Sequence, residues 1–266
     1  MKLVFDIGGT NTRLGLVSRG KLGPTKHFKT DSTASGIDFM LAQTLEFVAG
    51  HELTEAAGGF PGQIDRATGR IIHAKNLPEW QGQAFSPLLS ERLSAPVTVL
   101  NDVVLAGLGE ANFGAGRGKA IVVYFTVSTG VNGVRIIDGL VDRNVRGFEV
   151  GAQLMSDDEG NVSTLEGLTG GAALKQRTGS DPRNITDPAI WRQEARFLAR
   201  GLYNSCLHWS PDVVVLGGPI MNDISIDDVI YEMQRHPDMT GGWPDIVPAS
   251  LGDERGLQGA VALLKS

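Results

Sequence analysis

A glycine-rich turn near the start of the chain carries residue types that bind phosphate. A short apolar run ends at Asp6, and the turn that follows contains Gly8, Gly9, Thr10 and Asn11. Adjacent glycines allow positive φ angles and bring backbone N–H groups close to an anion, while a carboxylate at the strand end can hold a hydrated Mg²⁺. A plain β-hairpin explains the same residues, because Gly-Gly and Asn are common in hairpin turns.

A second turn of similar composition lies near the middle of the chain. The strand-like run 124–127 leads into residues 128–133, Ser-Thr-Gly-Val-Asn-Gly, and another run, 134–137, leads out of them. Two such turns indicate a duplicated phosphate-binding device, in which two lobes with one hairpin each would hold a nucleoside triphosphate. Neither turn is a Walker A loop, since no Gly-Lys-Ser/Thr follows, and the dinucleotide-binding pattern G-x-G-x-x-G is absent.

The composition is that of a folded globular chain with a slight excess of acidic groups. Of the 266 residues, 41% are hydrophobic and 20% are charged, and the formal net charge is −6. This charge argues against nucleic acid as a partner, and no apolar run approaches the roughly 18 residues of a membrane span. The first strand-like run follows Met1 directly, without a leader, and the one cysteine, Cys206, excludes an internal disulfide. We therefore expect a cytoplasmic protein.

Strand-like and helix-like segments alternate along the chain, which favours a layered α/β fold. Apolar periodicity predicts three strands within residues 1–30, further strands at about 56–60, 70–74, 97–100 and 212–216, and helices at about 36–49, 85–93, 102–113, 188–209 and 254–264. Gly114, Gly116 and Gly118 interrupt this pattern, because three glycines in five residues rarely belong to a regular element. We therefore place a domain boundary after residue 113.

Several short motifs, taken in their order and spacing, resemble those of the ROK group of sugar kinases and related repressors. They lie along nearly the whole chain, at residues 6–10, 61–65, 76–80, 101–102, 128–130, 149–151, 165–166, 216–218 and 256–260. The resemblance implies a two-lobed actin-like, ribonuclease H-like ATPase fold with a duplicated β-sheet and flanking helices. Residues 1–113 would form the N-terminal lobe, completed by a C-terminal helix at about 251–266, and residues 114–250 would form the C-terminal lobe.

The resemblance also implies roles for individual residues. Asp102 matches the general base that takes the proton of a sugar hydroxyl, although a helix N-cap is the alternative reading of an Asp at this point. The implied sugar-binding residues are Gly62, Asn76, Asn101, Asp102, Glu149 and Glu166. The implied nucleotide-binding residues are Asp6, Gly8, Gly9, Thr10, Asn11, Thr129, Gly130, Gly133, Gly217 and Gly218, and Asp6 would hold Mg²⁺ through water.

Simpler explanations remain open for part of this set. Glu149 and Glu166 suit a polyol, because carboxylates only accept hydrogen bonds and buried hydroxyls must donate them. Two surface glutamates would look the same in the sequence. Likewise, Gly217 and Gly218 match a turn beside the adenosine, but any tight turn after a strand would have the same residues.

The chain departs from the group's pattern where the group binds structural zinc. Ala152 stands where a histidine is usual, and residues 152–165 contain neither cysteine nor histidine. A zinc site needs about four nitrogen or sulfur ligands, so we expect none here. Residues 157–159, Asp-Asp-Glu, could attract a hard cation or form a solvated acidic loop. The second turn also contains fewer glycines than is usual.

Together these features predict an ATP- and Mg²⁺-dependent kinase, similar to glucokinases, that phosphorylates a hydroxyl of a hexose or amino-hexose and forms a homodimer. A sugar-sensing regulator is a second hypothesis, but the group's repressors carry an N-terminal helix-turn-helix domain, and here the first strand begins at residue 2. A third hypothesis is a sugar-binding protein with impaired turnover, suggested by Ala152 and the altered second turn. The presence of Asp6 and Asp102 argues against it.

Overall fold

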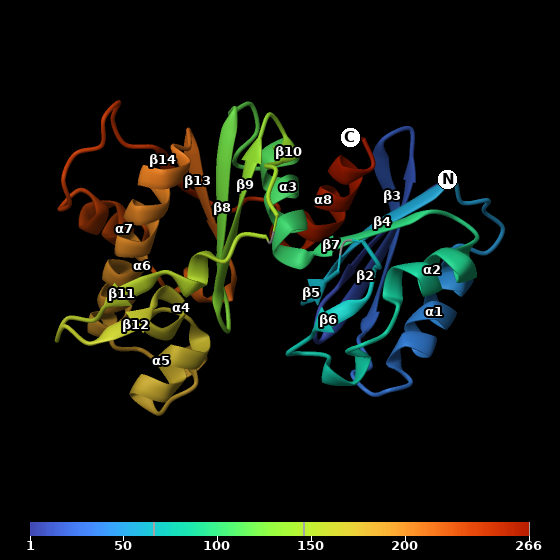
Figure 1. Cartoon of the computed structure of the whole chain (residues 1–266), viewed down its shortest axis with the longest axis horizontal. Coiled ribbons are helices and arrows are strands. Elements are labelled where there is room, and N and C mark those ends of the chain that lie inside the picture. The colour runs from blue at the N-terminus through green and yellow to red at the C-terminus, as the bar shows by residue number, and fades with distance from the viewer. Residues whose placement is uncertain (66, 146, 266) are drawn as a thin grey trace. The chain divides into compact units, whose positions relative to one another are not determined.

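The computed structural model describes residues 1–65, 67–145 and 147–265, and the chain forms two compact units. Unit 1 consists of Met1–Phe113 together with Leu251–Ser266, and unit 2 consists of Gly114–Ser250. Each unit contains one five-stranded sheet with helices packed against it (Figure 1).

The sheet of unit 1 combines an antiparallel meander with two parallel strands, in the order β3-β2-β1-β4-β7. Its strands are β1 (Lys2–Ile7), β2 (Asn11–Ser18), β3 (Lys21–Lys29), β4 (Glu55–Phe60) and β7 (Val97–Asn101). A small two-stranded sheet, β5 (Gln63–Ile64) and β6 (Ile71–His73), and the short helix η1 (Pro78–Trp80) lie between β4 and β7 in the sequence. Because β1, β4 and β7 are parallel, their carboxyl ends lie at one edge of the sheet.

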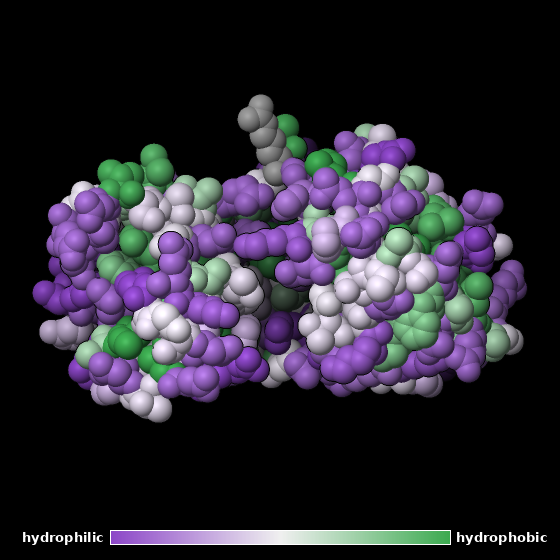
Figure 2. Space-filling view, turned by 90° about the horizontal axis from the view of Figure 1, so that it is seen from below, coloured by the Kyte–Doolittle hydropathy of each residue, from purple (hydrophilic) through white to green (hydrophobic). Residues whose placement is uncertain are grey.

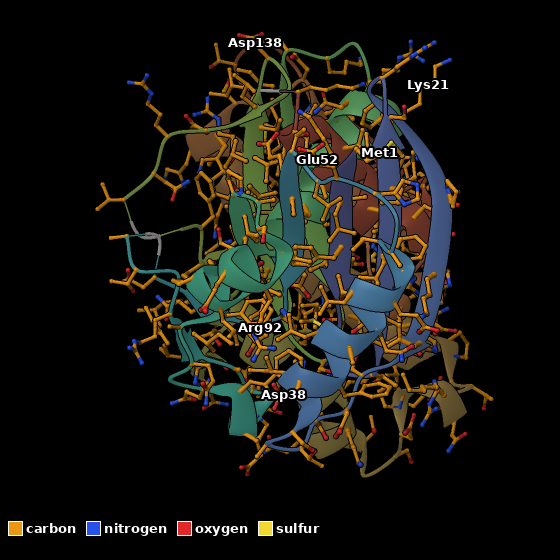
Figure 3. The ribbon with its side chains drawn as sticks, turned by 90° about the vertical axis from the view of Figure 1, so that its right-hand side faces the viewer. Met1, Lys21, Asp38, Glu52, Arg92 and Asp138 are labelled. Carbon is orange, nitrogen blue, oxygen red and sulfur yellow. The ribbon has the colours of Figure 1, made fainter. Side chains whose placement is uncertain are left out.

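Two pairs of helices cover this sheet. α1 (Gly36–Phe47) and α2 (Phe85–Leu93) lie on one face, where Figure 3 shows them in front of the strands, with Asp38 on α1 and Arg92 on α2 labelled. α3 (Asp102–Phe113) and α8 (Arg255–Leu263) pack together on the other face, and η5 (Gly252–Glu254) leads into α8.

The alternation of side chains along β1 determines which of its residues face the core and which face α8. Successive side chains of a strand point to opposite faces of its sheet. Leu3, Phe5 and Ile7 are therefore buried in the core together with residues of α1 and α2. Asp6 points to the other face, where a Cβ atom added to Gly256 of α8 would lie 2.9 Å from its Oδ1.

The sheet of unit 2 has the order β10-β9-β8-β13-β14. Its strands are β8 (Ile121–Val127), β9 (Val131–Ile137), β10 (Leu140–Val141), β13 (Val213–Gly217) and β14 (Asp245–Pro248). The strand directions repeat those of unit 1, with three antiparallel strands followed by two parallel ones. This repetition confirms the duplicated sheet that the family resemblance implied.

The helices and small elements of unit 2 pack around the long helix α6 (Pro188–Trp209). Phe197, Leu198 and Leu202 of α6 are buried in a core with residues of β8 and β13. The remaining elements are η2 (Val150–Ala152), β11 (Leu154–Ser156), β12 (Val162–Thr164), α4 (Leu165–Leu168), α5 (Gly171–Thr178), η3 (Pro182–Asn184), η4 (Pro219–Asn222) and α7 (Ile226–Met233).

The structure corrects several sequence-based expectations. The second turn is shorter than predicted, because Val131, Asn132 and Gly133 belong to β9. The apolar spacing of the 188–209 segment puts Leu207 on the core face of the predicted helix, but in the structure Leu207 is exposed. Residues 157–159, expected either to form a solvated acidic loop or to attract a hard cation, lie at the tip of the β11–β12 hairpin. Asp158 and Glu159 are exposed there, which agrees with the acidic loop, but Asp158 also forms ion pairs with arginines of α6, which were not expected. Periodicity missed this hairpin, because three-residue strands are too short to show it.

The surface visible in Figure 2 is mostly hydrophilic in each unit, with smaller apolar patches among the polar side chains. Within the described part of the chain, no helix is long and apolar enough to cross a membrane.

Candidate functional site

Two carboxylates meet at the carboxyl edge of the unit 1 sheet. Asp6 lies near the end of β1, and Asp102 opens α3 directly after β7. Gly59 of β4 is paired with Asp6 and separates the two strands. A Cβ atom on Gly59 would lie 3.2 Å from Asp6 Oδ1 and 3.4 Å from the Asp102 Cα. The absence of a side chain at Gly59 therefore lets the two acidic residues approach each other.

Burial makes both carboxyl groups weaker acids than an ordinary aspartic acid, and the charge of Asp6 adds to this effect at Asp102. Burial raises the pKa of Asp6, and the charges of Arg13 and Arg255 oppose this effect. The pKa of Asp102 is raised to about 7, first by burial and then by the negative charge of Asp6, against the hydrogen bond from the Val103 N–H. A carboxylate with a pKa near neutrality can accept a proton from an alcohol at physiological pH more effectively than an ordinary aspartate.

Arg13 belongs to this site through the hairpin register. It is the β2 partner of Asp6, and its Nη1 lies 3.9 Å from Asp6 Oδ2. Its Nη2 lies 3.3 Å from Asp253 Oδ2, on η5 next to α8. No role was predicted for Arg13, Arg255 or Asp253. Asp253 and Arg255 are far from Asp6 along the chain, so no local signal could have revealed them.

The first glycine-rich turn is closed by hydrogen bonds that leave two N–H groups available. Gly8 N–H donates to the Asn11 carbonyl (2.8 Å), and Thr30 donates to the carbonyls of Gly8 (Oγ1, 2.7 Å) and Thr10 (N–H, 2.9 Å). No described residue accepts a hydrogen bond from the N–H of Gly9 or Thr10. Such a turn fits an anion, because its donors lack protein partners.

The reason for glycine in this turn differs from the prediction. Neither Gly8 nor Gly9 has a positive φ angle, so the expected left-handed backbone is wrong. Close packing requires glycine instead: a Cβ on Gly9 would lie 2.8 Å from the Cβ of Asn76. Asn76, an implied sugar-binding residue, is exposed and lies directly against the implied phosphate-binding turn.

Asn101 and Gly62 lie together beside Asp102. The Asn101 Nδ2 donates to the Gly62 carbonyl (3.0 Å), and its Oδ1 accepts from the Val103 N–H (3.0 Å). Asp102 Oδ1 accepts from the same N–H (2.9 Å). Asn101 therefore caps the first turn of α3, and Asp102 shares the capping role that the sequence left open as an alternative. Its second oxygen remains for other chemistry.

The second turn, residues 128–130, is backed by a helix N-terminus in unit 2. The Gly171 and Ala172 N–H groups at the start of α5 donate to the carbonyls of Ser128 (2.7 Å) and Thr129 (2.9 Å). Glu166 of α4 reaches the same turn: its Oε2 accepts from the Val131 N–H (3.0 Å). A Cβ on Gly130 would lie 2.7 Å from the Glu166 Cδ. An implied sugar ligand and an implied phosphate turn therefore touch in this unit as well.

Glu149 is exposed and precedes η2, which lies next to α4. A Cβ on Gly151 of η2 would lie 3.3 Å from the Glu166 Cβ. Glu149 also lines a cavity of about 530 Å³ whose other walls include Gln153, Ser205 and Trp209.

The last three implied nucleotide-binding glycines have different surroundings. Gly218 has a φ of +96° and turns the chain across the end of β8, where a Cβ would lie 2.7 Å from Thr126 Oγ1. A Cβ on Gly217 would lie 2.5 Å from the Tyr124 Oη. Gly133 lies within β9, where a Cβ would lie 2.7 Å from the Tyr124 carbonyl, so hairpin packing requires glycine there.

The segment that would carry zinc ligands does not fit this metal. Residues 152–165 contain no cysteine or histidine. Across the described residues, no group of three or more His, Cys, Asp or Glu side chains is arranged to hold a metal ion.

Comparison with known proteins places this geometry in a family. The model of the ROK family matches residues 3–266. The chain belongs to the ROK family. It is 27% identical to the glucokinase of Thermotoga maritima over 315 aligned positions, which cover 100% of this chain and 98% of the relative.

Solved structures of ROK family members have the same fold. The ROK hexokinase from Thermus thermophilus is 28% identical, with a TM-score of 0.84 and coverage of 99% of this chain and 98% of that one. A ROK family glucokinase from Streptomyces griseus, solved in complex with glucose and AMPPNP, is 25% identical, with a TM-score of 0.76 and coverage of 98% of both chains. These likenesses confirm the actin-like fold that the motifs predicted.

Proposed function

We propose that this ROK family member is an ATP-dependent sugar kinase that transfers a phosphoryl group to a hydroxyl of a hexose or amino-hexose. The observation that carries the proposal is the half-buried pair Asp6 and Asp102 at the strand ends of unit 1. Asp102 combines a pKa of about 7 with a position at the start of α3 next to Asn101 and Gly62. The similarity to glucokinases along the whole chain supports the same reaction.

In this proposal Asp102 is the general base. Its free carboxylate oxygen takes the proton of the attacking hydroxyl, while its other oxygen stays bound to the Val103 N–H and fixes the carboxyl plane. Gly62, Asn76, Asn101, Glu149 and Glu166 bind the other hydroxyls of the sugar. The amide of Asn101 is held between Gly62 and Val103, so it presents a fixed edge to the substrate.

The nucleotide would be bound by both glycine-rich turns. The unpaired N–H groups of Gly9 and Thr10 suit phosphate oxygens, and Thr129 and Gly130 form the corresponding turn of unit 2. Gly217 and Gly218 would lie beside the adenosine. Asp6 would hold Mg²⁺ through water, and its repulsion of Asp102 is the kind of charge conflict that a divalent cation relieves. The bound Mg²⁺ would supply charge neutralisation at the phosphate oxygens.

A coupled assay of ADP release over a panel of hexoses and amino-hexoses tests the proposal. We expect at least one sugar to give turnover with MgATP, and we expect Asp102→Asn to abolish it while sugar binding persists, because an amide cannot accept the proton. Turnover of Asp102→Asn within about tenfold of the wild type would remove Asp102 as the base.

The same panel of sugars, tested for binding as well as for turnover, distinguishes a kinase from a sugar-binding or regulatory protein. Tight sugar binding without ADP release by the wild-type protein would favour a sugar-binding or regulatory protein of this fold. The homodimer and the cytoplasmic location stay predictions.

A further inference from the structure

A carboxylate that the proposed reaction does not use lies in the core of unit 2. Glu194 of α6 is completely buried, and its Oε1 forms an ion pair with Nη2 of Arg177 on α5. Burial raises the pKa of Glu194 to about 7, with Arg177 and the Gly170 N–H opposing the shift. The Arg177 side chain is 31% exposed, so only the Glu194 end of the pair is fully buried. Burying a carboxylate is expensive even when it is paired, and such a pair often contributes little to net stability. Its presence here therefore calls for a role other than stability.

The ion pair is attached to the corner between α4 and α5. Arg177 Nη1 donates to the carbonyl of Leu168 (2.9 Å), the last residue of α4. Its guanidinium lies 5.8 Å from the ring centre of Phe197, one turn along α6 from Glu194. The N–H of Gly170, the N-cap residue of α5, also stabilises the charged form of Glu194. Glu194 of α6 and its partner Arg177 therefore fix the backbone between α4 and α5 on the side that faces the core.

On its other side, the same corner contacts the second phosphate turn and the backbone that carries Glu166. The N–H groups of Gly171 and Ala172 bind the carbonyls of the second turn. Gly170 has a φ of +137°, and a Cβ there would lie 3.4 Å from the Gly130 Cα and 3.5 Å from the Glu166 carbonyl. A displacement of the corner would therefore move the phosphate turn and the backbone that carries Glu166 at the same time.

We propose that Arg177 and Glu194 are positioning residues that fix the second phosphate turn and Glu166 relative to each other, and so link nucleotide and sugar binding within unit 2. Neither residue belongs to the proposed sugar-binding or nucleotide-binding set. The kinetic effects expected below rest on the proposed kinase function. The structural link between the corner and the second turn rests only on the contacts described above.

Two variants test the proposal. Glu194→Gln removes the charge with little change of shape. The double variant Arg177→Met/Glu194→Leu replaces the pair by apolar side chains, which at a buried position such as Glu194 is often neutral or stabilising. The matched control is Asp245→Asn, which removes a carboxylate from the exposed Lys119–Asp245 ion pair. Asp245 lies at the amino end of β14, whereas Ser128 follows the carboxyl end of the parallel strand β8.

We expect kcat/KM for MgATP to fall roughly tenfold or more in both variants, because small displacements of positioning groups have effects of this size. KM for the sugar should rise as well, while the inhibition constant of adenosine, which has no phosphate, should stay unchanged. The double variant should keep a melting temperature near that of the wild type and yet show the kinetic defect. The control should keep all these constants.

Wild-type kinetic constants in a double variant of normal stability would overturn the proposal, as would an equal loss for adenosine and MgATP. Calorimetric titration of the same variants with AMPPNP provides a readout that does not need turnover. If the wild-type protein binds AMPPNP but phosphorylates no sugar, the kinase function fails while weaker AMPPNP binding by the variants still supports the positioning role. Unchanged AMPPNP binding in the variants contradicts it.

Discussion

Burial makes Asp102 a stronger base than an ordinary aspartate, and the same burial makes the folded protein less stable. A carboxylate loses hydration when it is buried, and here the charge of Asp6 adds repulsion. Arg13 and Arg255 reduce the pKa rise of Asp6 without removing it. Sites that keep two like charges close together typically sacrifice stability for function.

The pKa of Asp102 predicts a pH-dependent stability difference in protein without Mg²⁺. Between its usual value of 3.8 and about 7, folded Asp102 keeps a proton that unfolded Asp102 has released. The folded state binds more protons in this window, so the contribution of Asp102 to stability falls as pH rises. Asp102→Asn removes this loss. Its melting temperature relative to the wild type should therefore be higher at pH 8 than at pH 5, by thermal denaturation in EDTA.

Asp181→Asn is a suitable control for this measurement, because its effect on the melting temperature should be the same at pH 5 and at pH 8. Hydrogen bonds from Arg183 hold the pKa of exposed Asp181 well below its usual value of 3.8, so its contribution is constant above that value and is lost only in stronger acid. A melting-temperature difference for Asp102→Asn that is the same at pH 5 and pH 8 would contradict the assigned burial.

At the scale of elements, helices and strands with clear apolar periodicity were easier to predict than the short elements between them. The helices 85–93 and 188–209 agree with α2 and α6, because apolar periodicity marks both and Asp187 also caps α6. The β11–β12 hairpin and the short helix α4 were missed, since each is stabilised by contacts with α6 that no local pattern reveals. Among the site residues, the pairing of Asp6 with Asp102 depends on strand order, which sequence spacing alone does not fix.

The β11–β12 hairpin is attached to α6 by ion pairs of Asp158 with Arg196 and Arg200, here called the clasp. Asp158 at the hairpin tip pairs with Arg196 and Arg200, and Arg200 Nη1 also donates to the Ser156 carbonyl (3.1 Å). Beyond the hairpin, Leu165 fits against Gly201 of α6, where a Cβ would lie 2.5 Å from its Cδ2. These contacts hold the segment that carries Glu166.

We therefore expect the protein to fold without zinc and to depend on the clasp instead. Arg200→Ala should lower the melting temperature by about 2–4 °C, corresponding to about 1 kcal/mol for a partly exposed ion-pair network, and raise the KM for sugar. EDTA should leave the wild-type melting temperature unchanged, and Arg183→Ala, in an exposed pair with Asp181, should have a smaller effect. Stoichiometric zinc by elemental analysis, or unfolding by a chelator, would refute this expectation.

At the scale of the whole molecule, the C-terminal segment returns to unit 1 and completes it. Helix α8 packs against α3 and the sheet, and its Leu257, Ala260 and Val261 are almost fully buried. The two helices approach closely at glycines: a Cβ on Gly109 of α3 would lie 3.1 Å from the backbone nitrogen of Gly259. Unit 2, in contrast, is formed by one continuous stretch of chain.

Truncation after Ser250 should therefore unfold unit 1 and spare unit 2. Full burial of a Leu or Val side chain contributes about 1.5–3 kcal/mol, so loss of Leu257, Val261 and Leu264 removes an amount comparable to the roughly 5–15 kcal/mol that stabilises a domain. The truncation also exposes Asp6 to water, because Gly256 no longer covers it. Limited proteolysis followed by mass spectrometry should show rapid cleavage within 1–113 and a protected fragment within 114–250. A protected fragment spanning 1–113 in the truncated protein would show that α8 is dispensable for this unit.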